Sequence, residues 1–311
     1  MKPFETVIYD KKWYKHTALV MINLPDELNS YLLSTLREMI EAFEDAMWDD
    51  DIQFIVLTGA GERAFCTGGN VREYAEIYNK KPADFWKWGE VYGRVLDIIR
   101  HCGKPVIARV NGVTAGGGFE FVAACDLAIA SENAYFLSPG PRVGMTSIGG
   151  LSQWLPLHMS IKHAAEIVML SQQIPAHRAL QWGVVNEVVP YEKLDETVKR
   201  YIDQMMNLSP ASLHYFKVHI NFWRDLVWDL TWEHAREWFA LHLGSMEPSE
   251  GLWAFKQKRK RQYDRLREFI ASGGDTQYPF GPYLAECEAC GTKYLPLNSR
   301  FCLNCGKELK K

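Results

Sequence analysis

Two glycine-rich turns hold residue types that could carry chemistry. One reads AFCTGGNVREYAE over residues 64–76, and the other reads NGVTAGGGFE over residues 111–120. Each follows a predicted strand and precedes a predicted helix, where main-chain N–H groups lack a partner inside the helix. Two such groups can donate to one oxygen as it becomes negative, and removing one donor costs about 3–4 kcal/mol in a transition state. The turns therefore predict an oxyanion hole, with the carboxylate of Glu120 beside it.

These glycines have a second interpretation, because loop glycines often serve only to let the chain turn. The chain contains neither the GxGxxG fingerprint of a dinucleotide site nor the GxxxxGK[ST] pattern of a phosphate loop. Spacing alone therefore leaves both a structural role and an oxyanion hole open.

The cysteine pattern near the C-terminus predicts a metal site. Residues 287–305 read CEACGTKYLPLNSRFCLNC, two Cys-x2-Cys pairs separated by eleven residues. Four thiolates at this spacing can bind zinc tetrahedrally, and such a closed site is structural because no coordination position stays open. Two disulfides are the alternative, which an oxidising compartment would favour. The predicted zinc ligands are Cys287, Cys290, Cys302 and Cys305.

The segments around the two turns alternate between strand and helix patterns. This alternation is typical of an α/β protein whose parallel strands are covered by helices on both faces. Each glycine-rich turn then lies just beyond the end of a strand. Apolar runs of strand length occupy 17–24, 52–59, 105–110 and 126–130, and helical patterns occupy 33–47, 83–102 and 117–125.

The second half of the chain reads as mostly helical. Long helical patterns run over 191–207 and 210–270, and glycine, proline and aromatic residues over 271–283 indicate a linker. The basic run KQKRKRQYDRLR over 256–267 predicts either a solvated helix face or a contact with a phosphate-bearing ligand. The many tryptophans between 154 and 253 indicate packing in a core or at a subunit interface.

Composition narrows the class of protein. The chain has 311 residues and a formal net charge of −3, which gives no general attraction for nucleic acid. Its start lacks the basic and apolar regions of a signal peptide, and no apolar run is long enough to span a membrane. We therefore expect a cytoplasmic protein with reduced thiols at Cys66, Cys102 and Cys125.

Three stretches taken together resemble the crotonase (enoyl-CoA hydratase/isomerase) superfamily. They are FCTGGN, KPVIARVNGVTAGGGFEFVAACDLAIASENAYF and SEGLWAFKQKR, and the resemblance covers about residues 5–265. It implies repeated ββα units wound in a spiral, followed by a helical trimerisation region, in a homotrimer or a homohexamer. It also implies an acyl-CoA substrate whose thioester enolate is stabilised by two main-chain N–H groups.

Matching these motifs residue by residue implies roles for several positions. Gly69 and Gly117 would be the oxyanion-hole donors, and Glu120 would be one of the two acid/base glutamates of the hydratases. Lys258 stands in FKQKR, where family members place a basic residue near the phosphates of CoA. Candidates for polar support in the pocket are Asn70, Glu73, Tyr74, Ser138 and Thr146.

One position departs from the hydratase pattern. In hydratases the second glutamate follows a proline, whereas the matching stretch here is FLSPGPRVGMTSIGG over 136–150, with Gly140 at that place. Hydration needs one group to activate water and often another to deliver the α-proton, so this departure argues against two-carboxylate hydration. We expect Gly140 to leave space for a ring in the substrate pocket. We also expect the lone carboxyl of Glu120 to have a raised pKa in an apolar pocket.

The combination of Glu120 with Gly140 resembles the ring-opening branch of the superfamily, the 6-oxocyclohex-1-ene-1-carbonyl-CoA hydrolases. The hypothesis is hydrolytic C–C ring opening of a cyclic oxoacyl-CoA, with hydration of an enoyl double bond as an earlier step. An enoyl-CoA or dienoyl-CoA hydratase/isomerase is one alternative. A non-catalytic acyl-CoA-binding scaffold is the other.

The expected organisation has four parts: the spiral core over 1–205, the trimerisation region over 206–270, the linker over 271–283 and a zinc ribbon over 284–311. Zinc is the expected structural cofactor, and coenzyme A enters as part of the substrate. Further copies of the chain and a protein that docks on the ribbon are the other expected partners. We expect no nucleic-acid or membrane partner.

Overall fold

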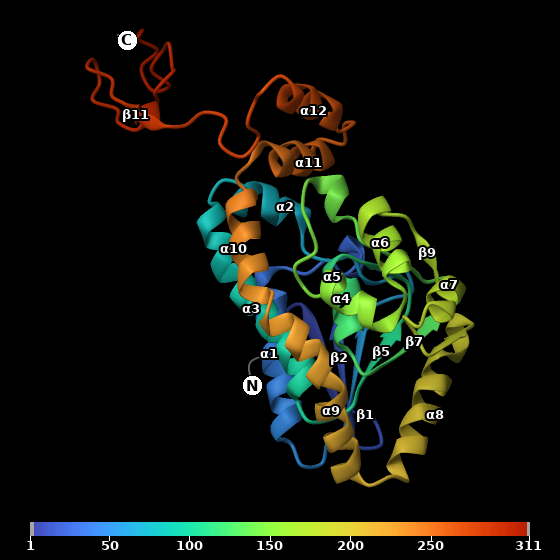
Figure 1. Cartoon of the computed structure of the whole chain (residues 1–311). Coiled ribbons are helices and arrows are strands. Elements are labelled where there is room, and N and C mark those ends of the chain that lie inside the picture. The colour runs from blue at the N-terminus through green and yellow to red at the C-terminus, as the bar shows by residue number, and fades with distance from the viewer. Residues whose placement is uncertain (1–2, 310–311) are drawn as a thin grey trace.

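A six-stranded sheet forms the centre of the protein, for which a computed structural model describes residues 3–309 (Figure 1). The first two strands form an antiparallel hairpin, and every later neighbour in this sheet is parallel. In spatial order the strands are β1 (Val7–Tyr14), β2 (Thr17–Ile22), β3 (Phe54–Gly59), β5 (Val106–Val110), β7 (Leu127–Ser131) and β10 (Glu187–Val189).

A second sheet has four short strands, β4 (Ala64–Cys66), β6 (Val113–Ala115), β8 (Tyr135–Leu137) and β9 (Ile174–Pro175). The first three are parallel, and β9 is antiparallel to β8. The sequence patterns did not predict this sheet, because strands of two or three residues are too short to show periodicity.

The two sheets alternate along the chain. Strands β3, β5 and β7 of the large sheet are followed by β4, β6 and β8 of the small one, and a helical segment comes after each pair. This repetition is the expected spiral of ββα units, so the predicted α/β fold class is confirmed. It also places the two glycine-rich turns at the ends of strands in the small sheet.

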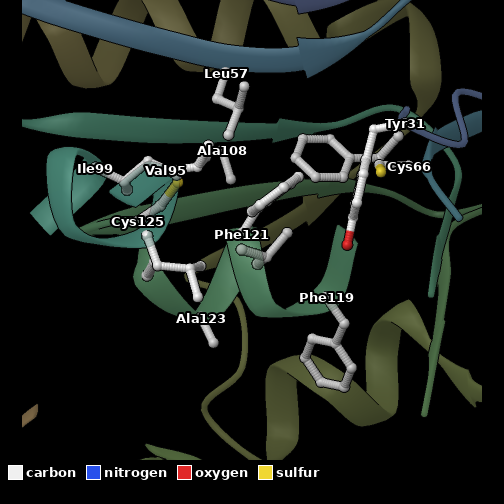
Figure 2. Close-up of a cluster of buried hydrophobic side chains, with 14 of the residues drawn as sticks. Tyr31, Leu57, Cys66, Val95, Ile99, Ala108, Phe119, Phe121, Ala123 and Cys125 are labelled. Carbon is white, nitrogen blue, oxygen red and sulfur yellow. The ribbon is translucent and has the colours of Figure 1, made fainter. Parts of the chain in front are cut away.

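Helices cover both faces of the large sheet (Figure 1). On one face, Val56 of β3 lies in an apolar cluster with Val198 of α8 (Leu194–Met206). On the other face, Leu57 of β3 packs toward Val95 of α3 and Phe121 of α4, as Figure 2 shows. The helices on this second face are α1 (Leu33–Trp48), α3 (Pro82–His101) and α4 (Gly117–Ala124).

Shorter helical elements complete the core. They are η1 (Pro25–Glu27), α2 (Val71–Glu73), η2 (Tyr74–Tyr78), η3 (Gly140–Val143), α5 (Leu151–His158), α6 (Ile161–Leu170), α7 (Ala176–Gln181) and η4 (Tyr191–Lys193). Within residues 3–309, no helix is both long enough and apolar enough to cross a membrane.

The helical pattern over 210–270 is four helices rather than one stretch. They are α9 (Pro210–Asp229), α10 (Trp232–His242), α11 (Met246–Lys256) and α12 (Tyr263–Ala271). Glu250 holds the break between the last two, because it pairs with Arg259 and accepts a 2.7 Å hydrogen bond from the Gln262 amide. The predicted basic run is therefore divided by this break.

The segment 272–282 contains no helix or strand, as expected of a linker, yet it packs on the body. Thr276 is buried, and its carbonyl accepts a 3.0 Å hydrogen bond from the Met246 amide. After it, β11 (Tyr283–Ala285) pairs with β12 (Leu295–Pro296) in a small unit that extends away from the rest of the protein (Figure 1).

Candidate active site

The two glycine-rich turns meet at one edge of the small sheet. Strand β4 lies parallel to β6, and parallel strands bring their carboxyl ends to the same edge. Gly69 follows β4 by three residues, and Gly117 begins α4 directly after β6 and Gly116. The turns are close enough that a Cβ added to Gly68 would lie 3.1 Å from the Gly117 nitrogen. Gly68 has a φ of +91°, which a residue with a side chain rarely adopts.

The main-chain N–H groups of Gly69 and Gly117 are available to a ligand. Within the part of the chain that the structure describes, neither group donates to a protein acceptor, although Tyr31 bonds to both neighbours of Gly69. Both glycines line one cavity of about 100 Å³. The sequence motifs therefore come together as two free donors at one apolar pocket.

Aromatic side chains form much of the cavity wall, and Glu120 is its single carboxylate among the described residues. Ser138, Gly140, Thr146 and Ser147 add small or polar groups to the lining. The aromatic lining residues are Tyr31, Tyr74, Phe85, Trp88, Tyr92 and Phe239.

Glu120 lies in the first turn of α4 and is only 3% exposed. Tyr92 donates to its Oε2, Ser147 donates to its Oε1, and the Gly149 amide donates to Oε1 at 2.7 Å. Burial raises the pKa of the Glu120 carboxyl above its ordinary value, and these hydrogen bonds oppose the rise because they stabilise the charged form. The expected raised pKa is confirmed, and it suits a base that takes and returns a proton.

Sequence patterns did not identify the residues that hold Glu120. Tyr92 lies inside the long helix α3, where its position reads as an ordinary buried face. Ser147 and Gly149 lie in the loop that joins η3 to α5, and no spacing rule connects them with α4. The sequence analysis singled out the stretch GMTSIGG only because its segment differs from the hydratase pattern, and it assigned no role to Ser147 or Gly149.

Gly140 lines the cavity, but the expectation that it makes space for a ring needs correction. A Cβ at this position would lie 2.9 Å from the Met145 carbonyl oxygen and 3.3 Å from the carbonyl carbon of Thr146. The glycine therefore allows the main chain of the following loop to fold back closely. That loop carries Ser147 and Gly149 to Glu120, where both donate hydrogen bonds to the carboxylate.

The remaining candidates divide into two groups. Tyr74, Ser138 and Thr146 line the cavity. Asn70 caps α2 and donates to Glu27 at 2.6 Å, which is a structural role. Glu73 is half-buried outside the lining, and burial raises the pKa of its carboxyl.

Lys258, the expected contact for CoA phosphates, is exposed just after α11 and outside the cavity lining. Its backbone has a φ of +54° at the point where the helix ends. Three other cations of the basic run are engaged in ion pairs, Lys256 with Glu76, Arg259 with Glu250 and Arg267 with Asp264. These pairs favour the interpretation of the run as a solvated surface rather than as a contact for a phosphate-bearing ligand.

The four C-terminal cysteines form a cluster that can hold zinc. Their sulfur atoms all lie within 4.8 Å of one another. The Sγ atoms of Cys287 and Cys305 are 3.7 Å apart, as are those of Cys290 and Cys302. A tetrahedral zinc site with Zn–S bonds of about 2.3 Å has sulfur–sulfur edges of about 3.8 Å, so the cluster fits this ion. Its separations are far longer than the ~2.05 Å of a disulfide bond.

Comparison with known proteins agrees with the fold and the site. The family model described as enoyl-CoA hydratase/isomerase matches residues 13–265. An enoyl-CoA hydratase from Mycobacterium avium subsp. paratuberculosis K-10 is 26% identical, with 84% of this chain and 99% of that chain covered and a TM-score of 0.74. The two sheets and their ββα spiral are thus a crotonase fold. The chain belongs to the enoyl-CoA hydratase/isomerase family of acyl-CoA enzymes.

Two further solved structures are similar to this chain. Carnitinyl-CoA hydratase from Mycobacterium avium is 28% identical over 84% of this chain and 98% of its own, with a TM-score of 0.73. A monofunctional enoyl CoA isomerase from M. smegmatis is 31% identical over 71% of this chain and 94% of its own, with a TM-score of 0.61. Each of these three structures aligns with only part of this chain, at most 84% of it.

The hydrogen bond from Ser147 leads to a prediction for the pH profile. If ionised Glu120 is the base, kcat/KM should fall as the pH drops through its raised pKa. Ser147→Ala removes a donor that stabilises the carboxylate, so that pKa should rise further and the acidic limb should move up by about one pH unit. Steady-state rates between pH 4 and 9 measure the shift. Ser152→Ala, at an exposed serine of α5 outside the cavity lining, is the matched control, and an unmoved limb in Ser147→Ala would contradict the prediction.

Proposed function

We propose that this protein opens the ring of a cyclic oxoacyl-CoA by hydrolysis of a C–C bond. One observation carries the proposal: the cavity pairs two free main-chain donors, at Gly69 and Gly117, with a single buried carboxylate at Glu120. Two donors suit the oxygen of a thioester enolate. One base suits the activation of water, and the second glutamate of the hydratases is replaced by Gly140.

The substrate is a β-oxoacyl-CoA, with the ring ketone on the carbon next to the α-carbon of the thioester. The reaction begins with the carboxylate of Glu120, which takes a proton from water while the water oxygen attacks the ring ketone. Collapse of the adduct breaks the ring C–C bond, and its electron pair moves into the thioester carbonyl. The enolate oxygen then accepts hydrogen bonds from Gly69 and Gly117, as an oxyanion hole provides. Protonation of the α-carbon completes a dicarboxylic acid that is still attached to CoA at one end.

The shape of the pocket supports a compact acyl group. Its volume is about 100 Å³, which is below the roughly 150 Å³ of an apolar cavity known to hold benzene, so a long acyl chain does not fit inside it. Buried aromatic rings form the wall around this space, with Trp88 and Tyr92 stacked at 5.1 Å between centroids. A six-membered ring that enters from the open side fits such a wall better than a long flexible chain does.

Hydration of an enoyl-CoA is the second candidate function, and the comparisons favour keeping it. Two of the similar solved structures are hydratases by their descriptions, and a third is an isomerase. Conjugate addition of water would pass through the same enolate and use the same base. The two reactions can also occur in sequence on a cyclic oxo-enoyl substrate.

Mass spectrometry of the products separates the candidates. The purified protein is incubated with an alicyclic oxo-enoyl-CoA and, separately, with crotonyl-CoA. Ring opening adds one water and creates a free carboxylate, which a carboxyl-specific reagent can label. Addition of water as a hydroxyl to either substrate, with no new carboxylate, would overturn the ring-opening proposal and leave hydration as the function.

Assembly into a homotrimer or homohexamer is part of the proposal. Helix α9 exposes a run of large apolar side chains that soluble monomers seldom leave uncovered, and further copies of the chain are the partner that we propose for it. Light scattering on the full chain measures the number of subunits. The run comprises Phe216, Ile220, Phe222, Trp223 and Leu226.

Zinc and a docking protein are the partners that we propose for the C-terminal unit. Among the described residues of this unit, buried side chains are restricted to a small cluster of Cys287, Leu295 and Cys302, so metal binding would supply much of its folding free energy. Its exposed Tyr294 and Leu303 support contact with another protein.

A further inference from the structure

We propose that the Tyr31 hydroxyl delivers the proton to the α-carbon, at the end of a chain of hydroxyl groups that runs through Tyr92 to Glu120. This inference rests on the enolate of the proposed function, and it assigns the proton donor that the missing second glutamate leaves open. Tyr31, Tyr92 and Glu120 come from three different segments of the chain and meet at one cavity.

Tyr31 lies beside the oxyanion-hole donor of α4. Figure 2 shows its hydroxyl at the first turn of that helix, and a Cβ added to Gly117 would overlap this hydroxyl. A thioester oxygen held by the Gly117 amide therefore has a phenolic O–H next to it. The α-carbon is bonded to the same thioester carbonyl, so it comes within reach of Tyr31 and not only of Glu120.

The hydroxyl groups connect Tyr31 with the carboxylate. Tyr92 donates to Glu120 Oε2, and the neighbouring Tyr31 hydroxyl limits the rise in the pKa of Tyr92 that its burial causes. The two phenol rings stack with centroids 5.8 Å apart and an interplanar angle of 21°. Tyr74 lines the same cavity, and its hydroxyl fills the Cβ position of Gly69. The hydroxyl chain thus lies against both donor glycines.

Packing holds Tyr31 in one orientation. Its side chain is 2% exposed, and its ring lies 5.3 Å from Phe121 and 6.4 Å from Trp88, measured between centroids. Burial raises the pKa of the Tyr31 phenol above its ordinary value, which favours the neutral, protonated form. A fixed, neutral O–H can give its proton only if another proton replaces it at once, and Tyr92 supplies that replacement.

The proton inventory balances. Glu120 first gains the proton that water loses when it attacks the substrate. The enolate carbon then forms a C–H bond with the Tyr31 proton, the Tyr31 oxygen takes the Tyr92 proton, and the Tyr92 oxygen takes the proton from Glu120. Each hydroxyl turns to donate toward the substrate in this step. The carboxylate is regenerated, no oxidant or reductant is needed, and the same relay serves ring opening and conjugate hydration.

Exchange of the α-proton tests the relay without ring opening. Cyclohexanecarbonyl-CoA has an α-proton but no ketone or double bond, so in D2O the protein can only exchange that proton for deuterium. We expect Tyr31→Phe to slow the mass increase of one by at least about 100-fold, since loss of a general acid or base has effects of this size. The phenyl ring preserves the stacking with Trp88 and Phe121, and the Kd for the thioester should change little.

Tyr78→Phe is the matched control. Tyr78 is a buried tyrosine of the same aromatic cluster, 6.2 Å from Tyr74 between ring centroids, but it does not line the cavity. This variant should exchange the proton at the wild-type rate. Tyr92→Phe breaks the middle of the relay and should resemble Tyr31→Phe.

The outcomes separate the relay from the proposed function. Wild-type exchange rates in Tyr31→Phe would overturn the relay, even if ring opening by the wild-type protein stands. Conversely, a wild-type protein that exchanges the α-proton through Tyr31 but opens no ring would overturn the ring-opening function and support the relay. Loss of thioester binding in Tyr31→Phe would assign the hydroxyl to binding and overturn its role as the proton donor.

Discussion

Glu120→Gln should lower the turnover number about 10³-fold while the protein stays folded. The amide keeps the shape of the carboxyl but cannot accept a proton from water, and general base catalysis typically contributes about 10²–10⁴-fold. Single-turnover rates on the substrate identified by mass spectrometry measure the loss. Near-normal turnover would remove Glu120 from the mechanism.

The stability of this variant provides an internal check. Because burial raises the pKa of Glu120 in the folded state, protonation favours folding at low pH, and this contribution is lost as the pH rises through the folded pKa. A neutral amide avoids that loss, so Glu120→Gln should unfold at a temperature no lower than that of the wild type at pH 8. Glu73→Gln changes another partly buried carboxyl, outside the cavity lining, and should keep its activity.

Gly117→Ala should reduce kcat by about 10²–10³-fold, the usual cost of losing one oxyanion-hole donor. The added methyl group would overlap the Tyr31 hydroxyl, so either the hydroxyl or the main chain must move. Either movement displaces the N–H from the thioester oxygen or displaces the proposed proton donor. The loss should therefore appear in kcat rather than in KM alone.

Gly89→Ala is the control for this substitution. Gly89 lies in α3, where a Cβ would meet the flexible side chain of Arg236 at 3.0 Å and no residue of the cavity. It should retain wild-type kinetics. If Gly117→Ala matched it, the assignment of Gly117 as a donor to the reacting oxygen would fail.

The fold could be predicted from the sequence where patterns are long. The apolar runs of the large sheet and the periodicity of residues 33–47 and 83–102 correspond to β2, β3, β5, β7, α1 and α3. The small sheet could not be predicted, because each of its strands has two or three residues and pairs with a segment far away in the chain. The end of α9 could not be predicted, because the apolar periodicity of the sequence continues through the turn at Leu230 and Thr231.

The site was partly predictable for a similar reason. Gly69, Gly117 and Glu120 stand in contiguous motifs, and the structure gathers them at one cavity. Tyr31 and Tyr92 belong to no motif, because their role depends on where tertiary packing places their hydroxyls. Asn70 shows the opposite case. Its place next to Gly69 in the sequence led us to expect it in the pocket, but its side chain caps α2 instead.

The loop between η3 and α5 has a consequence for how the substrate is selected. Residues of this loop form part of the cavity wall, and the same loop carries Ser147 and Gly149 to the carboxylate. A substrate that presses against this part of the wall would therefore change the hydrogen bonds that Ser147 and Gly149 donate to the Glu120 carboxylate. We therefore expect an acyl group of the wrong size to displace these donors and so change both the pKa and the position of the Glu120 carboxylate.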